Sequence, residues 1–414
     1  MKVVIMAGGK GTRIASVNSD VPKPMIPIDG KPILEYQINA LAAQGYCEII
    51  LIIGHLGHVI RDYFEDGSKW NVQISYIEEN TPLGTAGALF YLKEQIKDDF
   101  LLLNGDIIFD VDIRRFLAYH KAQGTMATIL THPNSHPYDS GIIVADNDGR
   151  ATNWLHKEDP RLWYRNRVNA GLHMLSPRIF SFFSDLQKKD LDRDILKPLI
   201  IQRELSVYDS PEYIKDMGTP DRYYSVIEDI HSGKVAAKNL ARKQKAIFLD
   251  RDGTINKYVG FLTNIDEFEL LDGVAEAIRQ INESGYLAIV ASNQPVIARG
   301  EVSPEELQEI HNKMETLLGQ KGAYLDAIFY CPHHPHKGYE GERPEYKIEC
   351  ECRKPKPGML LAAAEKYNID LTQSWMIGDS DNDIEAGQAA GCRAIKVNTN
   401  SSELSSAVKM ILNQ

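Results

Sequence analysis

Three cysteines and one histidine in the second half of the chain have the spacing of a metal site. They occur as Cys331-x-His333 and Cys350-x-Cys352, and a polar loop of sixteen residues that contains glycine and proline separates the two pairs. Three thiolates and a neutral imidazole form a closed tetrahedral set, which suits structural zinc and leaves no position for a catalytic water. We therefore predict a zinc site that holds this loop; the alternative is a loop with unpaired cysteines.

Two carboxylates follow a short apolar run earlier in the same half. In KAIFLDRD the run ends in Asp250-x-Asp252, which predicts a buried parallel strand with both acids at its carboxyl end. Open α/β sheets bind their ligands at that end. One carboxylate there can attack phosphorus to form an aspartyl phosphate, and a second can protonate the leaving alcohol and then activate water. The pattern predicts hydrolysis of a phosphate ester.

Three later groups supply the rest of such a site. LAIVASNQ repeats the pattern of a strand followed by a polar loop and offers Ser292 and Asn293 to a phosphate oxygen. Lys354 supplies a cation for the transferring phosphoryl group. WMIGDSDND ends a third strand in Asp379 and Asp383, whose carboxylates can hold a hard, oxygen-liganded ion such as Mg²⁺.

A glycine-rich loop follows the first apolar strand of the chain. KVVIMAGGKGTRI contains Gly8, Gly9 and Gly11, followed by Thr12 and Arg13. Glycines let backbone N–H groups approach phosphates closely, and the arginine adds a fixed cation. The spacing fits neither GxGxxG with a later acid nor GxxxxGK[ST], so neither a Rossmann dinucleotide site nor a Walker loop is predicted.

The order of the carboxyl-terminal motifs, DxDGT, then S-N, then K, then GDxxxD, resembles the haloacid dehalogenase-like phosphatases over residues 245–398. DRDGTIN, the SNQxxIARG segment, CPHH and CECRKPKPGM are most similar to the branch of histidinol-phosphatases and heptose-bisphosphate phosphatases, whose zinc loop shapes the substrate pocket. The resemblance implies that Asp250 is the nucleophile and Asp252 the acid/base. Small residues are usual in this branch where the chain has Pro295 and Val296, so we expect a backbone contact to the substrate to be missing there.

The same resemblance implies contacts for the other polar residues of this half. Asp250, Asp379 and the backbone carbonyl of Asp252 would bind Mg²⁺, and Ser292 and Lys354 would hold the phosphate. Arg299 and Arg353 would contact the rest of the substrate. Asn293 stays a candidate phosphate contact from its position after the strand. The zinc loop keeps its structural role in this interpretation.

The first 232 residues carry a second set of motifs. KVVIMAGGKGTRI is followed by VPKPMIP, PLGTAGA and LLLNGD, and together they resemble the sugar-1-phosphate nucleotidyltransferases. The resemblance implies that Lys23 neutralises the phosphates in the transition state and that Asp106 and Asp216 hold Mg²⁺. The implied substrate contacts come from Gly8, Gly9, Gly11, Thr12 and Arg13 at the triphosphate, from Gly84, Thr85 and Asn104 in the later motifs, and from Asn169, Gly171 and Gly141 at the sugar.

Two features bear on which substrates this set would take. Glu79 stands just before PLGT, where the family reads the base; its carboxylate can accept from guanine N1–H and N2–H₂ together, or it can be a solvated acid. SVNSDVPKPM and ILEYQINAL most resemble the heptose-1-phosphate guanylyltransferases, followed by the mannose-1-phosphate guanylyltransferases. The family's Glu-Lys-Pro element is replaced by Lys157-Glu158-Asp159-Pro160, which leaves Lys157 and Glu158 without an assigned role.

Length and composition fit two α/β domains in tandem, because 414 residues exceed the usual size of one domain. A polar, lysine- and alanine-rich stretch at 231–245 separates the two sets of motifs. We predict a nucleotidyltransferase domain at 1–232 with a Rossmann-like mixed sheet and a linker at 233–244. A haloacid dehalogenase-like phosphatase domain at 245–414, with a Rossmannoid parallel sheet and the zinc loop, would follow.

Charge and cysteine content predict a cytoplasmic enzyme that acts on small molecules. A net charge of -11 and a pI near 5.6 argue against binding to nucleic acid or anionic membranes. No apolar run approaches the ~20 residues that span a bilayer, and VVIMA is too short for a signal peptide. Five cysteines, three of them assigned to zinc, indicate a reducing compartment without disulfides. A homo-oligomer is compatible with the sequence.

We expect a bifunctional enzyme that makes a nucleotide-activated heptose. The phosphatase would remove the 7-phosphate of a manno-heptose 1,7-bisphosphate, and the nucleotidyltransferase would join the resulting 1-phosphate to GMP from GTP and release pyrophosphate. The first alternative is a mannose-1-phosphate or other hexose-1-phosphate nucleotidyltransferase fused to a different sugar-bisphosphate or histidinol phosphatase. An alternative of another class, a regulatory or binding protein with one inactive domain, is disfavoured because the catalytic residues of both sets are present.

Overall fold

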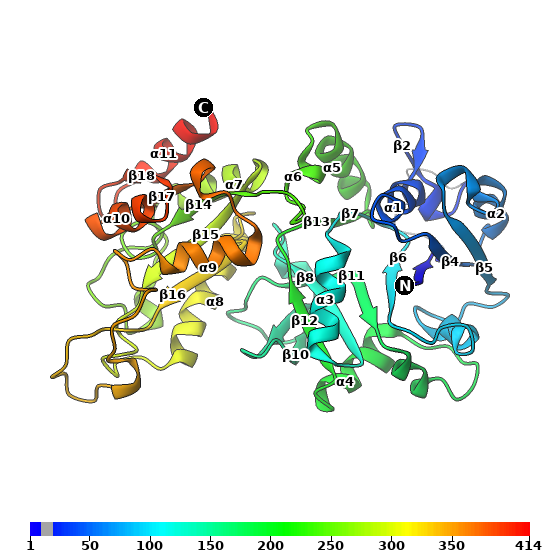
Figure 1. Ribbon diagram of the computed structural model, residues 1–414, viewed down its shortest axis with the longest axis horizontal. Coiled ribbons are helices and arrows are strands. Elements are labelled where there is room, and N and C mark those ends of the chain that lie inside the picture. Colours follow the sequence, from blue (N-terminus) through cyan, green and yellow to red (C-terminus); the bar gives the residue numbers. More distant parts are fainter. Residues whose placement is uncertain (10–19) are drawn as a thin grey trace. The chain divides into compact units, whose positions relative to one another are not determined.

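The chain forms two compact units, each built around its own sheet (Figure 1). The structure is a computed structural model that describes residues 1–9 and 20–414. The first unit comprises Met1–His132, Ile143–Trp154 and Asn169–Ala236, and the second comprises Pro133–Ile142, Leu155–Val168 and Ala237–Gln414. The second unit therefore includes two short segments from the first half of the chain. The functional borders at 232 and 245 stay a prediction.

Parallel strands form the centre of the first unit's sheet, in which seven of the nine strands follow the order β10-β9-β11-β6-β1-β4-β5. β4 and β6 run parallel to β1 on either side, and all three are buried almost throughout, as expected for strands covered on both faces. β11 runs antiparallel to β6, while β8 and β12 pair parallel, so the sheet is mixed. The strands are β1 (Val3–Met6), β4 (Glu48–Ile53), β5 (Gln73–Glu78), β6 (Phe100–Asn104), β8 (Ala127–His132), β9 (Ile142–Ala145), β10 (Ala151–Leu155), β11 (Val168–Leu175) and β12 (Leu205–Asp209).

A two-stranded arm in the first unit positions two acids. β13 (Tyr213–Asp216) pairs antiparallel with β7 (Ile107–Asp110) in a register that places Asp216 opposite Ile107, and hence beside Asp106. The Met217 backbone N–H donates to the Asp106 carbonyl over 2.9 Å and fixes the same register. The other elements of this part of the chain are β2 (Pro27–Ile28), β3 (Lys31–Pro32), α1 (Ile33–Ala42), α2 (Gly57–Phe64), α3 (Ile113–Gln123), α4 (Lys197–Ile201), α5 (Pro220–His231) and α6 (Lys234–Ala237).

The second unit contains a five-stranded parallel sheet in the order β16-β15-β14-β17-β18. Apolar clusters cover both faces of this sheet, which explains the continuous apolar runs IFL and LAIVA in its central strands. The strands are β14 (Lys245–Leu249), β15 (Tyr286–Asn293), β16 (Ala327–Cys331), β17 (Trp375–Gly378) and β18 (Arg393–Lys396). The helices are α7 (Val274–Glu283), α8 (Pro304–Gln320), α9 (Gly358–Tyr367), α10 (Asp381–Ala389) and α11 (Glu403–Leu412).

Two of these helices begin with capping boxes that the sequence encodes locally. Ser303 and Glu306 cap α8, and Ser380 and Asp383 cap α10; in each pair a side chain accepts from the other residue's backbone N–H. The α10 box turns the chain directly after β17. The predicted pair of α/β folds, one mixed and one parallel, is confirmed. Over residues 1–9 and 20–414, no helix is long and apolar enough to cross a bilayer.

His173 makes the stability of the first unit depend on pH. It lies fully buried in β11, and burial lowers its pKa to about 4. The unfolded chain takes up this proton near pH 6.5, so stability is lost as the pH falls from about 6.5 toward 4, by about 2 kcal/mol between pH 7.5 and 5. We expect His173→Leu to remove this part of the pH dependence. The measurement is the free energy of unfolding at each pH, obtained from hydrogen exchange of the β11 amides at several urea concentrations. The exposed His58→Gln should behave like wild type, and an unchanged slope in His173→Leu would contradict the assignment.

Candidate active sites

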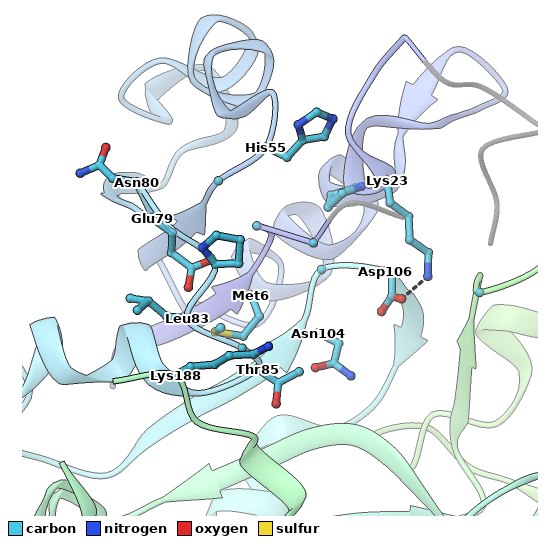
Figure 2. Close-up of a pocket in the computed structure, with 18 residues that line it drawn as sticks. Met6, Lys23, His55, Glu79, Asn80, Leu83, Thr85, Asn104, Asp106 and Lys188 are labelled. Atoms are coloured by element: carbon cyan, nitrogen blue, oxygen red, sulfur yellow. Dashed lines mark hydrogen bonds and ion pairs between the residues drawn. The ribbon is translucent and has the colours of Figure 1, made fainter. Parts of the chain in front are cut away.

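A pocket of about 800 Å³ lies in the first unit at the carboxyl ends of β1, β4, β5 and β6. Parallel strands end together at one edge of a sheet, so the polar residues that follow them meet there. Eight predicted substrate, catalytic or metal residues line it: Gly8, Gly9, Lys23, Glu79, Gly84, Thr85, Asn104 and Asp106. Figure 2 shows Glu79 on one side of the pocket and Lys23 with Asp106 on the other.

Lys23 and Asp106 form the ion pair of this pocket (Figure 2). The ammonium contacts Asp106 Oδ2, and the lysine side chain is nearly buried. Lys23 starts a short 3₁₀ helix between two prolines, which fix the backbone that presents it. A side chain at Gly105 would lie 2.8 Å from the Met6 carbonyl, so only glycine lets the loop after β6 approach β1 this closely.

Asp216 completes an acidic pair with Asp106. Arg222 Nη1 donates to both of its carboxylate oxygens, over 2.9 and 2.8 Å. Burial would raise the pKa of Asp216, but the charge and hydrogen bonds of Arg222 lower it below the usual value, so the carboxylate is ionised at neutral pH. A carboxylate has about four acceptor sites, so lone pairs remain. The β7–β13 register brings Asp216 beside Asp106, and carboxylate oxygens are ligands that suit Mg²⁺.

Glu79 is the acid at the far side of the pocket. A Cβ at Gly8 would lie 2.6 Å from Glu79 Oε2, so the glycine is what admits this carboxylate. Burial raises the pKa of Glu79, partly offset by the backbone N–H of Leu83. Among the described residues, Oε1 is buried without a hydrogen-bond partner. Glu79 is half-buried and lines the pocket, so its carboxylate suits a ligand that brings its own N–H donors.

Lys188 is a pocket residue that sequence reasoning missed. The backbone of the loop around it packs so closely on Gly84 and Gly87 that side chains at those glycines would overlap it. Thr85 Oγ1 accepts from the Leu191 N–H over 2.7 Å and pins the same loop. Lys188 belongs to a run of polar residues, QKKD, which has the signature of an ordinary solvated surface. Only the fold brings this cation to the pocket.

The predicted sugar residues are placed less directly. Gly171 has a φ of +75°, and a Cβ there would lie 2.8 Å from Asn104 Nδ2, so Gly171 contacts the edge of the pocket through Asn104. Its N–H donates to Asn169 Oδ1 over 3.1 Å. Among the described residues that line the pocket, Asn169, Gly171, Asp216 and Gly141 do not appear, and Gly141 belongs to the second unit. Gly11, Thr12 and Arg13 lie outside the described residues.

A smaller pocket of about 250 Å³ lies in the second unit at the carboxyl ends of β14, β15 and β17. Eight predicted residues line it: Asp250, Asp252, Ser292, Asn293, Arg353, Lys354, Asp379 and Asp383. Pro295 and Val296 also line it, as do Tyr258 and Phe261 of the segment that follows DRDGTIN. The predicted meeting of three strand ends therefore holds in the structure.

Lys354 is the buried cation of this pocket. Its Nζ donates to Asp250 Oδ1 and to the Ala291 carbonyl, each over 2.7 Å, and contacts Asp383 Oδ1. Reciprocal hydrogen bonds of 3.0 Å join its backbone to the side chain of Asn293. Asp383 also accepts from Ser380 in the capping box. Asp383 therefore orients the lysine, in addition to being a candidate metal ligand.

The carboxylates of Asp250, Asp379 and Asp383 lie within 4.8 Å of one another. Burial raises the pKa of Asp250 to about 7, against the lowering effect of Lys354. Gly253 has a φ of +88°, and a side chain there would overlap Asp379, so the glycine lets the loop after β14 reach this acid. Several buried carboxylates next to one lysine fit a site for a hard divalent cation, which would favour their ionised form.

Asp252 is held by groups that the motif does not reveal. Burial would raise the pKa of Asp252, but Arg251 and hydrogen bonds from Asn256 and Gln294 lower it. Sequence reasoning missed all three because two are amides in loops and one is an arginine between two acids. Gln294 is part of the SNQ motif, so its position next to Ser292 is the signal that could have found it.

The two predicted arginines differ in position. Arg353 lines the pocket, and its Nη1 donates to the His333 carbonyl over 3.2 Å. Arg299 is not among the described lining residues. Its guanidinium lies 4.0 Å from the centre of the Phe261 ring and pairs with Glu301 over 2.7 Å.

The four predicted zinc ligands converge. Cys352 Sγ lies 3.1 Å from Cys331 Sγ, 3.4 Å from Cys350 Sγ and 3.3 Å from His333 Nδ1. Tetrahedral Zn–S bonds of about 2.3 Å separate two sulfurs by about 3.8 Å, so a small outward movement would admit the ion. The donor set and geometry therefore fit structural zinc.

Two strand-end pockets with lysines, carboxylates and a metal-ligand cluster define a two-site α/β enzyme that acts on phosphates. The family model described as Nucleotidyl transferase matches residues 2–233, and one described as HAD-hydrolase-like matches 351–411. The D-glycero-beta-D-manno-heptose-1,7-bisphosphate 7-phosphatase of Pasteurella multocida is 46% identical over 147 residues, which are 36% of this chain and 77% of that protein. The same enzyme of Escherichia coli K12 is 42% identical over 151 residues, again 36% of this chain and 77% of the relative.

A crystal structure of HddC from Yersinia pseudotuberculosis complexed with GMP-PN is 28% identical, covers 55% of this chain and 99% of its own, and has a TM-score of 0.48. The chain belongs to the nucleotidyl transferase family, and its second part belongs to the phosphatase family of the relatives above. It is therefore an enzyme with a nucleotidyltransferase site and a phosphatase site.

Cys352→Ser tests the metal cluster. We expect it to release about one zinc per chain and to speed hydrogen exchange in residues 333–350. Lys354 follows two residues later, so phosphatase activity should fall on the order of a hundredfold, the effect of a displacement of about 1 Å. Cys47→Ser, at an exposed thiol outside the cluster, is the matched control and should keep the metal. Wild-type protein without zinc, purified without chelator, would reject the site.

Proposed function

We propose that this chain catalyses two consecutive steps in the synthesis of GDP-heptose. The second unit would remove the 7-phosphate of D-glycero-D-manno-heptose 1,7-bisphosphate. The first would transfer GMP from GTP to the remaining 1-phosphate and release pyrophosphate. The observation that carries the proposal is the identity of 46% to a 7-phosphatase, joined in one chain to a nucleotidyltransferase whose substrate that phosphatase would supply.

The phosphatase residues support an aspartyl-phosphate mechanism. In this mechanism Asp250 would attack phosphorus, and Asp252 would protonate the leaving oxygen and then deprotonate water. Lys354 and Ser292 would neutralise and bind the phosphoryl oxygens. A divalent cation at Asp250 and Asp379 would add positive charge to the transferring group. Arg353 at the pocket edge is available to the rest of the substrate.

The first pocket supports nucleotidyl transfer by positioning and charge neutralisation. Lys23 would neutralise the phosphates as the sugar phosphate oxygen attacks the α-phosphorus and pyrophosphate leaves. Asp106 and Asp216 would hold Mg²⁺, which would supply positive charge next to the phosphates. Lys188 adds a second cation on another wall of the pocket. At the opposite end, Glu79 would accept from the base.

We also propose a cytoplasmic location and small-molecule substrates alone. None of the five cysteines, all within the described residues, forms a disulfide, which is compatible with a reducing compartment. Zinc at the Cys/His cluster and Mg²⁺ at both catalytic sites are the cofactors of the proposal.

Two isosteric variants test whether the chemistries reside in separate sites. We expect Asp250→Asn to lower phosphate release on the order of a thousandfold or more, because it removes the nucleophile, and to leave pyrophosphate release from heptose 1-phosphate and GTP unchanged. Asp106→Asn should lower pyrophosphate release about 10²- to 10³-fold and leave phosphate release unchanged. The measurement is the rate of each release by the folded full-length variants. Loss of both activities in either variant would contradict two independent sites.

Base choice tests Glu79. If its carboxylate accepts both guanine donors, the enzyme should prefer GTP, and Glu79→Gln should lower kcat/KM for GTP about ten- to hundredfold, because the amide sets a donor against a donor. The sugar-phosphate preference should hardly change. The assay is pyrophosphate release with each of the four nucleoside triphosphates. A wild-type preference for ATP, CTP or UTP would reject guanine while leaving nucleotidyl transfer in place.

A further inference from the structure

A buried arginine lies between the two acids of the phosphatase motif in sequence and contacts the second of them. Arg251 is fully buried, and its Nε and Nη2 donate to both carboxylate oxygens of Asp252 over 2.8–3.1 Å. Nη2 also donates to Gln294 Oε1 over 3.0 Å, and Nη1 lies 3.3 Å from His311 Nε2. The planar guanidinium thus joins Asp252 to two other segments of the unit.

Neighbouring amides add further hydrogen bonds to Asp252. Asn256 Nδ2 donates to Oδ1 over 3.0 Å, and Gln294 Nε2 donates to Oδ2 over 2.8 Å. The same Gln294 nitrogen donates to Ser292 Oγ over 2.8 Å, next to the candidate phosphate site. Each oxygen of Asp252 therefore has at least two donors. Turning the carboxylate would break several charge-assisted hydrogen bonds at once, so its orientation is fixed.

Helix α8 supplies the outer anchor of this network. His311 is buried in α8, and its ring centre lies 5.5 Å from that of Tyr330. Burial and the charge of Arg251 lower the pKa of His311 to about 3, so the ring is neutral and its Nε2 can accept from Arg251. A buried arginine is stable only when its donors have acceptors. His311 supplies the acceptor for Nη1, the guanidinium nitrogen that does not donate to Asp252.

We propose that Arg251, anchored by His311 and Gln294, is a positioning residue that holds the Asp252 carboxyl group toward the leaving oxygen of the phosphate ester. This inference rests on the proposed role of Asp252 as acid/base and names the groups that orient it. Lysine cannot take the place of Arg251, because a single ammonium lacks the planar fork that binds two oxygens of Asp252 together with Gln294.

Two proton transfers depend on this orientation. In the first, a bond forms between an Asp250 oxygen and phosphorus, the bond from phosphorus to the substrate oxygen breaks, and Asp252 in its protonated form gives its proton to that oxygen. In the second, a water oxygen attacks phosphorus, Asp252 takes a proton from that water, and the bond between Asp250 and phosphorus breaks. A displaced Asp252 would slow both steps.

The acidity of the leaving alcohol separates a positioning role from a general loss of structure. An alkyl alcohol needs the proton of Asp252 in order to leave, whereas p-nitrophenol leaves as a stable anion. Displacement of Asp252 should therefore slow phosphorylation of Asp250 by an alkyl phosphate and spare phosphorylation by p-nitrophenyl phosphate. Hydrolysis of the aspartyl phosphate should slow with both esters, because the intermediate is the same.

The test is rapid-mixing kinetics on full-length Arg251→Lys with heptose 1,7-bisphosphate and p-nitrophenyl phosphate. We expect a burst of p-nitrophenolate at nearly the wild-type rate, followed by turnover slowed about a hundredfold, and phosphorylation by the sugar ester slowed by a similar factor. The double variant Arg251→Lys/Asp252→Asn should turn over the sugar ester only slightly more slowly than Asp252→Asn alone, because both substitutions act on the same proton transfers. Equal slowing of both phosphorylation reactions, or no slowing, would overturn the inference.

A second pair of variants keeps the test decisive if Arg251→Lys does not fold. His311→Gln retains an acceptor for Arg251, whereas His311→Leu removes it. We expect a selective loss of about tenfold for the sugar ester in His311→Leu and recovery in His311→Gln. An equal loss in both variants would overturn the inference. If the wild-type enzyme hydrolyses fructose 1,6-bisphosphate and not the heptose ester, the proposed substrate is wrong. The role of Arg251 is then decided by comparing fructose 1,6-bisphosphate with p-nitrophenyl phosphate in the same variants.

Discussion

Both candidate active sites contain a nearly buried lysine that pairs with an acid at the carboxyl end of a parallel strand. Lys23 pairs with Asp106 after β6, and Lys354 pairs with Asp250 after β14. Acids gathered at a sheet edge repel one another and lose solvation, and a neighbouring cation offsets both effects. Removing one partner of such a buried pair typically costs about 3–5 kcal/mol. Each unit therefore has to bring a lysine from a separate loop to its strand ends.

Through this requirement the Cys/His cluster is connected to the phosphatase pocket, although its four residues are not among the described lining residues. Cys352 is two residues before Lys354, and Arg353 between them donates to the carbonyl of His333. The loop that carries the lysine is thus tied to the cluster at its start and to Asn293 at its end. A closed metal site with no catalytic water can serve catalysis by fixing where the next cation lies.

The sequence predicted those site residues that follow apolar runs. Asp250, Ser292 and Asp379 share one pocket because the carboxyl ends of parallel strands meet at one edge. Arg251 and His311 could not be predicted in this way. In the sequence, Arg251 is an ordinary charged residue between two acids, and His311 is one residue of an amphipathic helix. Their contact joins positions sixty residues apart, which no local pattern encodes.

Ion pairs between residues far apart in the chain are a further feature that composition does not reveal. Lys238, within the stretch 233–244 that is predicted to be a linker, lies buried against Asp326 over 3.2 Å. Within the same unit, Arg167 pairs with Glu315 of α8 over 3.0 Å, and both are buried. Opposite charges far apart in the chain can be buried only together, and this pairing is decided by the fold.

Phosphorus NMR of a single reaction with the full-length protein, heptose 1,7-bisphosphate, GTP and Mg²⁺ follows both chemistries at once. Two sites acting in sequence predict that the 7-phosphate signal first gives inorganic phosphate. The sugar 1-phosphate and the α-phosphate of GTP should then give a sugar nucleotide with an equal amount of pyrophosphate. Pyrophosphate formed while the 7-phosphate remains on the product, or inorganic phosphate without pyrophosphate at saturating GTP, would contradict this order.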